Sequence, residues 1–301
     1  MRIVLAPQDW LQRRDRHQSR VTKLLGPYLQ RRAEGQSNPV VDFLFTYYNL
    51  APGQLRRWHP GFGVTLTGPE SREYQNRRGY RRTDLGVAVD PEHLARRRPT
   101  VEYVARLMAA TLDRPVNLAC FGLHEWAMVY RAEPEQLRHS MPLRLGRDGT
   151  DAVVESMPLR CTHFDAFRFF TNPARIRNAQ QLSRQAQVAT EQPGCLHAGM
   201  DLYRFAAKLL PLVDSDLLMD AFELAYAARQ LDMRASPYDL RTFGYEAVPV
   251  ESACGRAEYA RQQAALAKRS ATVRLSLLRR CEELLAWLRT SGASRSPSQP
   301  R

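Results

Sequence analysis

The apolar residues in the last two-thirds of the chain recur with the period of an α-helix, and this pattern constrains the fold more than any other feature. From Val101 to Leu288 every long segment carries it, as in VEYVARLMAATLD and FGLHEWAMVYR. Spacings of three and four residues place apolar side chains on one helix face, where they can pack on a common core. We therefore expect a mainly α fold, with a helical core over residues 101–290.

The first third of the chain has a different character. Residues 1–35 combine helical spacing with many arginines, and residues 39–99 are dense in aromatic residues, Gly and Pro. Repeated turn signals of this kind predict a mixed, loop-rich N-terminal portion over residues 1–100, with short helices and a few strands. The last segment, SGASRSPSQPR, has the composition of a disordered tail, which we place at residues 291–301.

The charge balance is strongly basic. The chain holds 44 Lys and Arg against 31 Asp and Glu, a net charge of +13 at pH 7. Residues 1–100 alone hold 18 basic and 9 acidic side chains, so most of the excess lies there. Such a balance favours a polyanionic partner. Arginine dominates, which suits bidentate phosphate contacts, although a high-GC genome also favours arginine over lysine.

Cysteine usage and hydropathy indicate the compartment. The five cysteines are widely spaced and include no C-x-x-C pair, which predicts neither a disulfide framework nor a zinc knuckle. No apolar run approaches the length of about 18 residues that a membrane helix needs, and no signal-like segment opens the chain. We expect a cytoplasmic, nucleoid-associated protein that has no membrane contact and no obligate protein partner.

A polar stripe interrupts the apolar segment that follows Gln192. On a helix, four polar side chains would fall within roughly 60° of one another: His197, Asp201, Arg204 and Lys208. The stripe is either the solvent-facing edge of an amphipathic helix or the wall of an internal cleft. In a cleft, Asp201 could hydrogen-bond His197 one turn away and fix the tautomer of its imidazole.

The next helix is expected after Pro211, with Asp214 or Ser215 as its N-cap. Two acidic residues further along share a face that solvent would cover: Asp220 and Glu223. The segment LDMRASPYDLR then reads as a loop with four polar residues: Asp232, Arg234, Ser236 and Asp239. Polar residues grouped in a Pro-containing loop serve either turn chemistry or a positioned site.

Two further His-carboxylate pairs lie upstream, His124 with Glu125 and His163 with Asp165. Their spacing matches no H-E-x-x-H or standard zinc motif, but an H-x-D pair with a distant His can form a facial triad. A divalent transition metal is therefore an alternative to a cofactor-free site. Its candidate ligands are His124, His163, Asp165, His197 and Asp201. The chain holds no G-x-G-x-x-G, Walker or G-x-S-x-G motif, which removes the main support for nucleotide-dependent and serine-hydrolase functions.

Four blocks of sequence resemble a known family. They are FLFTYYNLAPGQLRRWHPG, FGLHEWAMVYR, LRCTHFDAFRFFTNPA and CLHAGMDLYRFAAKLLPLVDSDLLMDAFELAYAARQLDMRASPYDL. Together they resemble a family of actinobacterial proteins that commonly carries the name 3-methyladenine DNA glycosylase. The resemblance runs from about Pro39 to Gln263 and so covers most of the chain.

The resemblance implies a DNA repair enzyme that hydrolyses the N-glycosidic bond of alkylated purines such as 3-methyladenine, without a cofactor. Such an enzyme needs a pocket for a flipped base, a carboxylate that stabilises positive charge at C1′, and cations for the DNA backbone. On this interpretation the carboxylate is Asp201 or Asp165, oriented by His197 or His163. Base stacking is assigned to Trp126, Tyr203 and Phe164. Phosphate binding is assigned to Arg204, Lys208, Arg234, Arg77, Arg78, Arg81 and Arg82.

Two other classes of function fit the same residues. A His/carboxylate metalloenzyme that acts on a small anionic or nucleotide-like substrate would use the histidine pairs as ligands. A non-catalytic nucleic-acid-binding protein would need only the positive charge.

Overall fold

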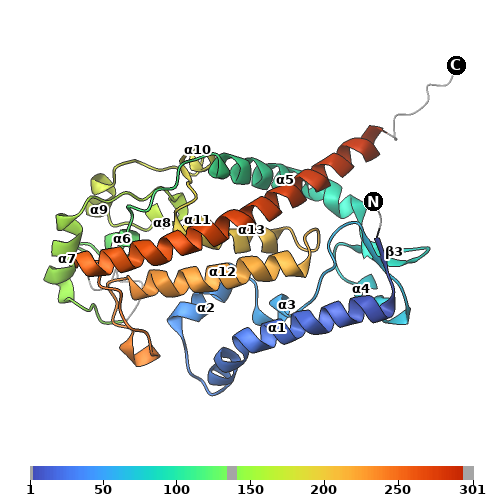
Figure 1. The fold of residues 1–301 in the computed structure, drawn as a ribbon, viewed down its shortest axis with the longest axis horizontal. Coiled ribbons are helices and arrows are strands. Elements are labelled where there is room, and N and C mark those ends of the chain that lie inside the picture. The colour runs from blue at the N-terminus through green and yellow to red at the C-terminus, as the bar shows by residue number, and fades with distance from the viewer. Residues whose placement is uncertain (1–2, 134–140, 294–301) are drawn as a thin grey trace.

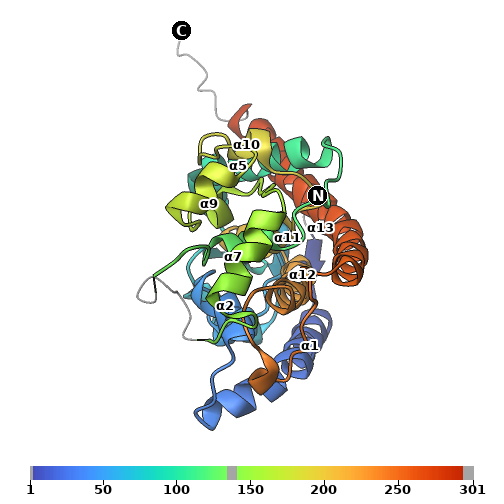
Figure 2. The ribbon, with the colours of Figure 1, turned by 90° about the vertical axis from the view of Figure 1, so that its left-hand side faces the viewer.

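The computed structural model describes residues 3–133 and 141–293, and the fold is mainly helical, as the apolar pattern predicts. Four long helices form the core: α5 (Pro91–Leu112), α11 (Leu196–Lys208), α12 (Ser215–Arg234) and α13 (Ala253–Ala293). Helix α13 packs against the other three, and α11 packs along α12. In both views α12 lies between α13 and the N-terminal helix α1 (Pro7–Ala33) (Figures 1 and 2).

Helix α11 is the most deeply buried of these elements. Most of its residues are inaccessible to solvent, including the two polar ones His197 and Asp201, whose exposures are 9% and 2%. Only Lys208, at its C-terminal end, is exposed. The solvent-edge interpretation of the polar stripe is therefore wrong for His197 and Asp201 and correct for Lys208. His197 faces Asp232 of α12, and Asp201 faces His163.

Shorter helices connect the long ones. The α-helices among them are α2 (Pro39–Thr46), α3 (Pro52–Leu55), α4 (Arg72–Gln75), α6 (Leu123–Ala127), α7 (Gly146–Ser156), α8 (Phe164–Phe167), α9 (Asn172–Arg177) and α10 (Gln187–Thr190), and the 3₁₀ turns are η1 (Pro69–Ser71) and η3 (Arg241–Phe243).

A small sheet lies at one end of the molecule and holds all the strands of the described chain. Its strands are β1 (Ile3–Leu5), β2 (Val64–Leu66), β3 (Tyr80–Thr83) and β4 (Gly86–Val89), in the order β1-β2-β4-β3. Strands β1 and β2 are parallel, with Ile3 opposite Val64, and the other pairs are antiparallel. The mixed N-terminal portion predicted from Gly, Pro and aromatic residues is confirmed.

The N-terminal portion and the helical region share one hydrophobic core. Trp10 and Leu25 of α1 belong to the same buried cluster as Phe222 of α12 and Leu284 of α13. Arg20 of α1 also binds the two acidic residues of α12 for which the sequence predicted a solvated face: its guanidinium lies 2.7 Å from Asp220 and 2.6 Å from Glu223. That face is an ion-paired contact with α1.

The cysteines, the hydropathy of the helices and the ends of α12 and α13 bear on the remaining predictions. All five cysteines are free. In the part of the chain that the structure describes, no helix has both the length and the apolar character needed to cross a bilayer. Helix α13 continues through residues 291–293, so the predicted tail does not begin at 291; residues 294–301 lie outside the described residues. The loop predicted around Asp232 is also wrong, because α12 continues to Arg234 before the chain turns at Pro237.

Candidate metal centre

Four helices place histidine and carboxylate side chains in one buried region. His124 and Glu125 lie on the short helix α6, which starts after Phe121 and Gly122, both with positive φ values, of 49° and 73°. A Cβ on Gly122 would lie 3.3 Å from both Ala235 and Tyr259, so glycine lets α6 approach the end of α12 closely. The remaining side chains come from α11, from α12, from the start of α8 and its N-cap residue His163, and from Glu191, the C-cap residue of α10.

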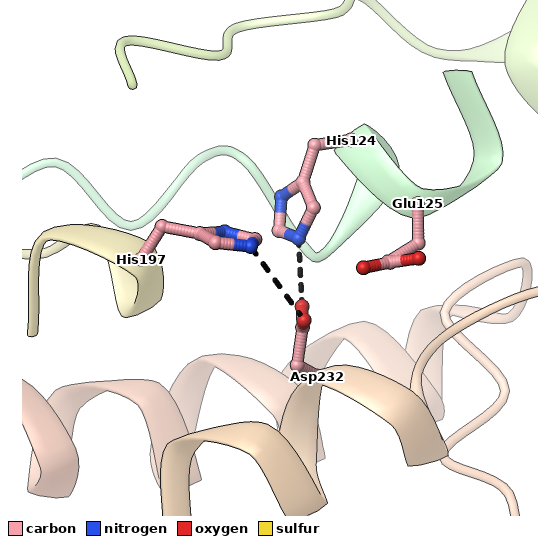
Figure 3. A group of neighbouring side chains, drawn as sticks. All are labelled: His124, Glu125, His197 and Asp232. Atoms are coloured by element: carbon pink, nitrogen blue, oxygen red, sulfur yellow. Dashed lines mark hydrogen bonds and ion pairs between the residues drawn. The ribbon is translucent and has the colours of Figure 1, made fainter. Parts of the chain in front are cut away.

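The first group consists of His124, Glu125, His197 and Asp232, which point toward a common space (Figure 3). The Nε2 atom of His124 lies 2.7 Å from Oδ1 of Asp232, and Nε2 of His197 lies 3.9 Å from Oδ2 of the same carboxylate. The two imidazole rings meet edge to face, with centroids 4.5 Å apart. Each of the four residues offers one potential ligand atom, and these four atoms all lie within 4.8 Å of one another. Small side-chain movements would bring them to the distances at which a metal ion is bound.

His197 is the least satisfied member of this group. Its Nδ1 is buried without a hydrogen-bond partner, and the 3.9 Å separation of Nε2 from Asp232 is too long for a hydrogen bond. Burial and the neighbouring His124 lower the pKa of His197 well below its usual value. The ring is therefore neutral at physiological pH and keeps a nitrogen lone pair for a ligand.

The carboxylates of the first group are held by Arg229. Its Nη1 lies 3.2 Å from Oε1 of Glu125 and 3.1 Å from Oδ2 of Asp232, and its guanidinium stacks 4.0 Å above the ring of Phe43. Burial raises the pKa of Glu125. The pKa of Asp232 is lowered although burial opposes this, because the positive charge of His124 lies beside it. The two acids therefore differ: Asp232 is a permanent carboxylate, and Glu125 can take up a proton.

A second group lies beside the first. The Nδ1 and Nε2 atoms of His163 lie 3.2 Å from Glu191 and 3.6 Å from Asp201, so this ring stands between two buried carboxylates. The His163 ring stacks on that of His197 at a centroid distance of 5.5 Å. Arg204 joins the remaining acid to the group, because its Nη1 lies 2.6 Å from Asp165 and 3.1 Å from Asp201.

A small cavity of about 30 Å³ is lined by residues of both groups. Glu125 and His197 line it from the first group, and Asp165 lines it from the second. Aromatic side chains form much of its remaining wall: Phe43, Tyr47, Phe169 and Tyr238. The volume is enough for about two water molecules, or for an ion with one water.

The first group fits a divalent transition metal better than the second. It offers the imidazoles of His124 and His197 and the carboxylate of Asp232, which is the donor set of a facial triad. Nδ1 of His197 also has no hydrogen-bond partner. The second group offers only one imidazole, although Nδ1 of His163 is also without a hydrogen bond, and its two acids share the cation of Arg204 as those of the first group share Arg229. The five metal ligands proposed from the sequence are thus divided by the structure: His124 and His197 belong to one group, and His163, Asp165 and Asp201 to the other.

The residues assigned to catalysis and base stacking have different surroundings. His163, Asp165, His197 and Asp201 are all buried in this region. Trp126 and Tyr203 are also fully buried and pack inside the core; the indole of Trp126 donates a hydrogen bond to the carbonyl of Ala235 at 2.8 Å. Phe164 is partly exposed and lies under the guanidinium of Arg184.

Of the residues assigned to phosphates, only Arg204 contacts the buried acids. Lys208 is exposed at the end of α11, and Arg234 donates from Nε to the carbonyl of Glu246 at 2.9 Å. The other four lie at β3 and just before it, at the end of the molecule opposite α6 and α8 (Figure 1). They are Arg77, Arg78, Arg81 and Arg82.

The sequence-based site assignments did not include Arg229, Asp232 or Glu191, although a positioned site was one of the two alternatives left open for Asp232. A signal was present for the first two. Arg229 and Asp232 are three residues apart and lie on the face of α12 that also buries Phe222 and Ala225. Two charged residues on a buried helix face need partners, and this identifies them as candidates. Glu191 ends the short helix α10, and no local pattern marks it.

Comparisons of this chain with protein-family models, with curated proteins and with solved structures find no match.

Proposed function

We propose that this protein is a metal-dependent enzyme whose divalent transition metal ion is held by His124, His197 and Asp232. The observation that carries the proposal is the buried ring of His197, which has no hydrogen bond to any described residue and faces both Asp232 and the cavity. Buried polar groups are nearly always partnered, so an unpartnered one needs an explanation such as a bound ion. Two imidazoles and one carboxylate are a donor set of non-haem metal enzymes.

The neighbouring residues suit hydrolysis of a small anionic or nucleotide-like substrate. A metal ion in such a site supplies a Lewis acid, which polarises a substrate oxygen and lowers the pKa of water. Glu125 lines the same cavity, and its raised pKa makes it a better proton acceptor than an exposed glutamate. We assign it the role of general base. Arg229 holds Glu125 and Asp232 in position and also lines the cavity.

Metal content tests the proposal directly. Protein stripped with a chelator and titrated with Co²⁺, Mn²⁺ or Zn²⁺ should bind about one ion per chain, and His197→Ala or Asp232→Asn should weaken binding about tenfold or more. Affinity should rise with pH, because the pKa of His124 is raised by Asp232 and Cys120 and the ring must lose its proton to bind.

A matched control is His93→Gln. His93 is also buried with an unpartnered ring nitrogen, but it belongs to no group of potential ligands in the described chain. Its substitution should leave metal binding unchanged. The proposal is wrong if the wild-type protein binds no ion above background, or if the His93 and His197 variants bind equally well.

Base excision from alkylated DNA is the second candidate. The observations in its favour are the net charge of +13 and the convergence of Asp165, Asp201 and His163 in one buried region. A cavity of about 30 Å³ does not hold a purine, and Trp126 and Tyr203 are fully buried. Base excision would therefore require the aromatic wall of the cavity to open.

A further inference from the structure

Three arginines converge on the single carboxylate of Asp165. Nη1 of Arg204 lies 2.6 Å from Oδ2, Nε of Arg168 lies 3.3 Å from Oδ1, and Arg184 also binds Oδ1. Asp165 is 2% exposed, whereas the side chains of Arg168 and Arg184 are 42% and 50% exposed. The cluster therefore extends from the wall of the cavity, which Asp165 lines, to the molecular surface.

The carboxylates in contact with these three arginines are too few to neutralise their positive charge. The other carboxylate in contact is Asp201, 3.1 Å from Arg204, and Glu191 is engaged by His163. In the described part of the chain, three guanidinium groups therefore face two carboxylates. A like-charged cluster of this kind at a partly exposed site favours an anionic ligand.

Aromatic rings lie beside the two outer arginines. The guanidinium carbon of Arg168 lies 4.2 Å from the ring centroid of Phe169, and that of Arg184 lies 5.0 Å from the ring centroid of Phe164. A cation–π contact of this kind attracts a guanidinium group while its N–H groups remain available for hydrogen bonds. Phe169 also lines the cavity, so Arg168 is anchored on a residue of the cavity wall.

We propose that Arg168, Arg184 and Arg204 form a phosphate-binding subsite that holds the substrate beside the candidate metal centre. The inference deepens the proposed function and rests on it for the position of the reacting group. Planar guanidinium groups match the oxygens of a phosphate through paired hydrogen bonds, and half-exposed ones can change partner without unfolding the site. A phosphate would add its charge to that of Asp165 in neutralising the three arginines.

Calorimetric titration of the chelator-treated, full-length protein with inorganic phosphate tests the subsite. We expect saturable binding that weakens about tenfold in Arg184→Gln and in Arg168→Gln, the loss typical of one charge-assisted contact. Arg184→Lys keeps the charge but not the planar geometry and should lie between wild type and Arg184→Gln. The matched control is Arg98→Gln, which removes a more exposed arginine that pairs with Glu102 on α5.

Two further titrations identify the kind of molecule that carries the phosphate. A small phosphate monoester, AMP, and a short single-stranded oligonucleotide are titrated into the same variants. If Arg184→Gln weakens only AMP, the subsite serves a small substrate; if it weakens both, the subsite also accepts a nucleic-acid backbone. Absence of phosphate binding by folded wild type, or equal binding by Arg184→Gln and Arg98→Gln, overturns the inference.

Phosphate binding and metal binding can be tested independently of each other. Phosphate binding is measured without metal, and Arg184→Gln should keep the metal affinity of wild type, because Arg184 contacts none of the proposed ligands. Metal binding without phosphate binding would remove the subsite alone. Phosphate binding without metal binding would leave an anion site and remove the metal-dependent reaction.

Discussion

His59 is a buried histidine outside the candidate metal centre, with Nδ1 2.8 Å from the hydroxyl of Tyr80. Burial lowers its pKa to about 3, so the folded protein keeps this ring neutral where the unfolded chain protonates it. Between about pH 6.5 and pH 3 the unfolded state therefore binds more protons, and the free energy of unfolding falls as the pH falls. Each pKa unit corresponds to about 1.4 kcal/mol, which limits the contribution of His59 to about 5 kcal/mol.

We predict that His59→Gln reduces the pH dependence of stability in this window. Urea unfolding of both proteins at pH 7, 5.5 and 4.5 measures the effect. Tyr80→Phe is the control, because it removes the hydroxyl and leaves the histidine to titrate. If the His59→Gln protein loses stability with acid as steeply as wild type, the ring does not titrate as the structure indicates.

Individual site residues could be predicted in part from the sequence. The sequence predicts three pairs, His124 with Glu125, His163 with Asp165 and His197 with Asp201, because a histidine beside or near a carboxylate is visible in a linear sequence. Their division into two groups depends on α6, α8 and α11 meeting in space, which no local pattern encodes. The sequence could not decide the role of Trp126, because an aromatic residue suits a base-binding wall and a hydrophobic core equally well. In the structure Trp126 is fully buried in the core.

At the scale of elements, the start of α12 was correctly predicted. Asp214 is its N-cap, and the Asp214 carboxylate accepts a hydrogen bond from the backbone N–H of Leu217 at 2.9 Å. This helix carries Arg229 and Asp232, so its stability affects the candidate metal centre. We predict that Asp214→Ala lowers the free energy of unfolding by about 1 kcal/mol.

Asp214→Asn is the matched control, because an asparagine oxygen can also cap the helix; its stability should stay within a few tenths of a kcal/mol of wild type. Thermal or urea unfolding of the two variants compares them. Equal losses in both variants would show that the charge of Asp214, and not its capping hydrogen bond, supports the helix.

The helices were easier to predict than the sheet. Helical periodicity is local, so the long helices of the C-terminal two-thirds could be predicted from spacing alone. The pairing of β1 with β2 joins residues 3–5 to residues 64–66, and a turn-rich sequence does not specify such distant partners. The end of α12 was misplaced because Asp232 and Arg234 have the composition of a loop, whereas burial of the helix determines where it ends.

At the scale of the whole molecule, the exposed arginines near β3 and the buried histidine groups lie at opposite ends (Figure 1). Arg78, Arg81 and Arg82 are exposed at β3, and none of them forms an ion pair with a described residue. The histidine groups lie near α6 and α8 at the other end (Figure 1). A nucleic acid held by the β3 arginines would therefore contact a different region from the one that holds the candidate metal centre.

We predict that replacing Arg78, Arg81 and Arg82 together by Gln weakens binding to mixed-sequence duplex DNA and reduces the salt slope of the binding constant by about 2 to 3, since each phosphate contact contributes about 0.9. Fluorescence anisotropy at several salt concentrations measures both quantities.

A His197→Ala, Asp201→Asn double variant should bind DNA as wild type does, because neither residue is exposed. If wild type releases 3-methyladenine from methylated duplex DNA and this double variant does not, DNA bound at one end must reach the buried groups at the other. If binding is intact and no base is released, the positive charge serves nucleic-acid binding alone, and the reaction of the buried groups has a different substrate.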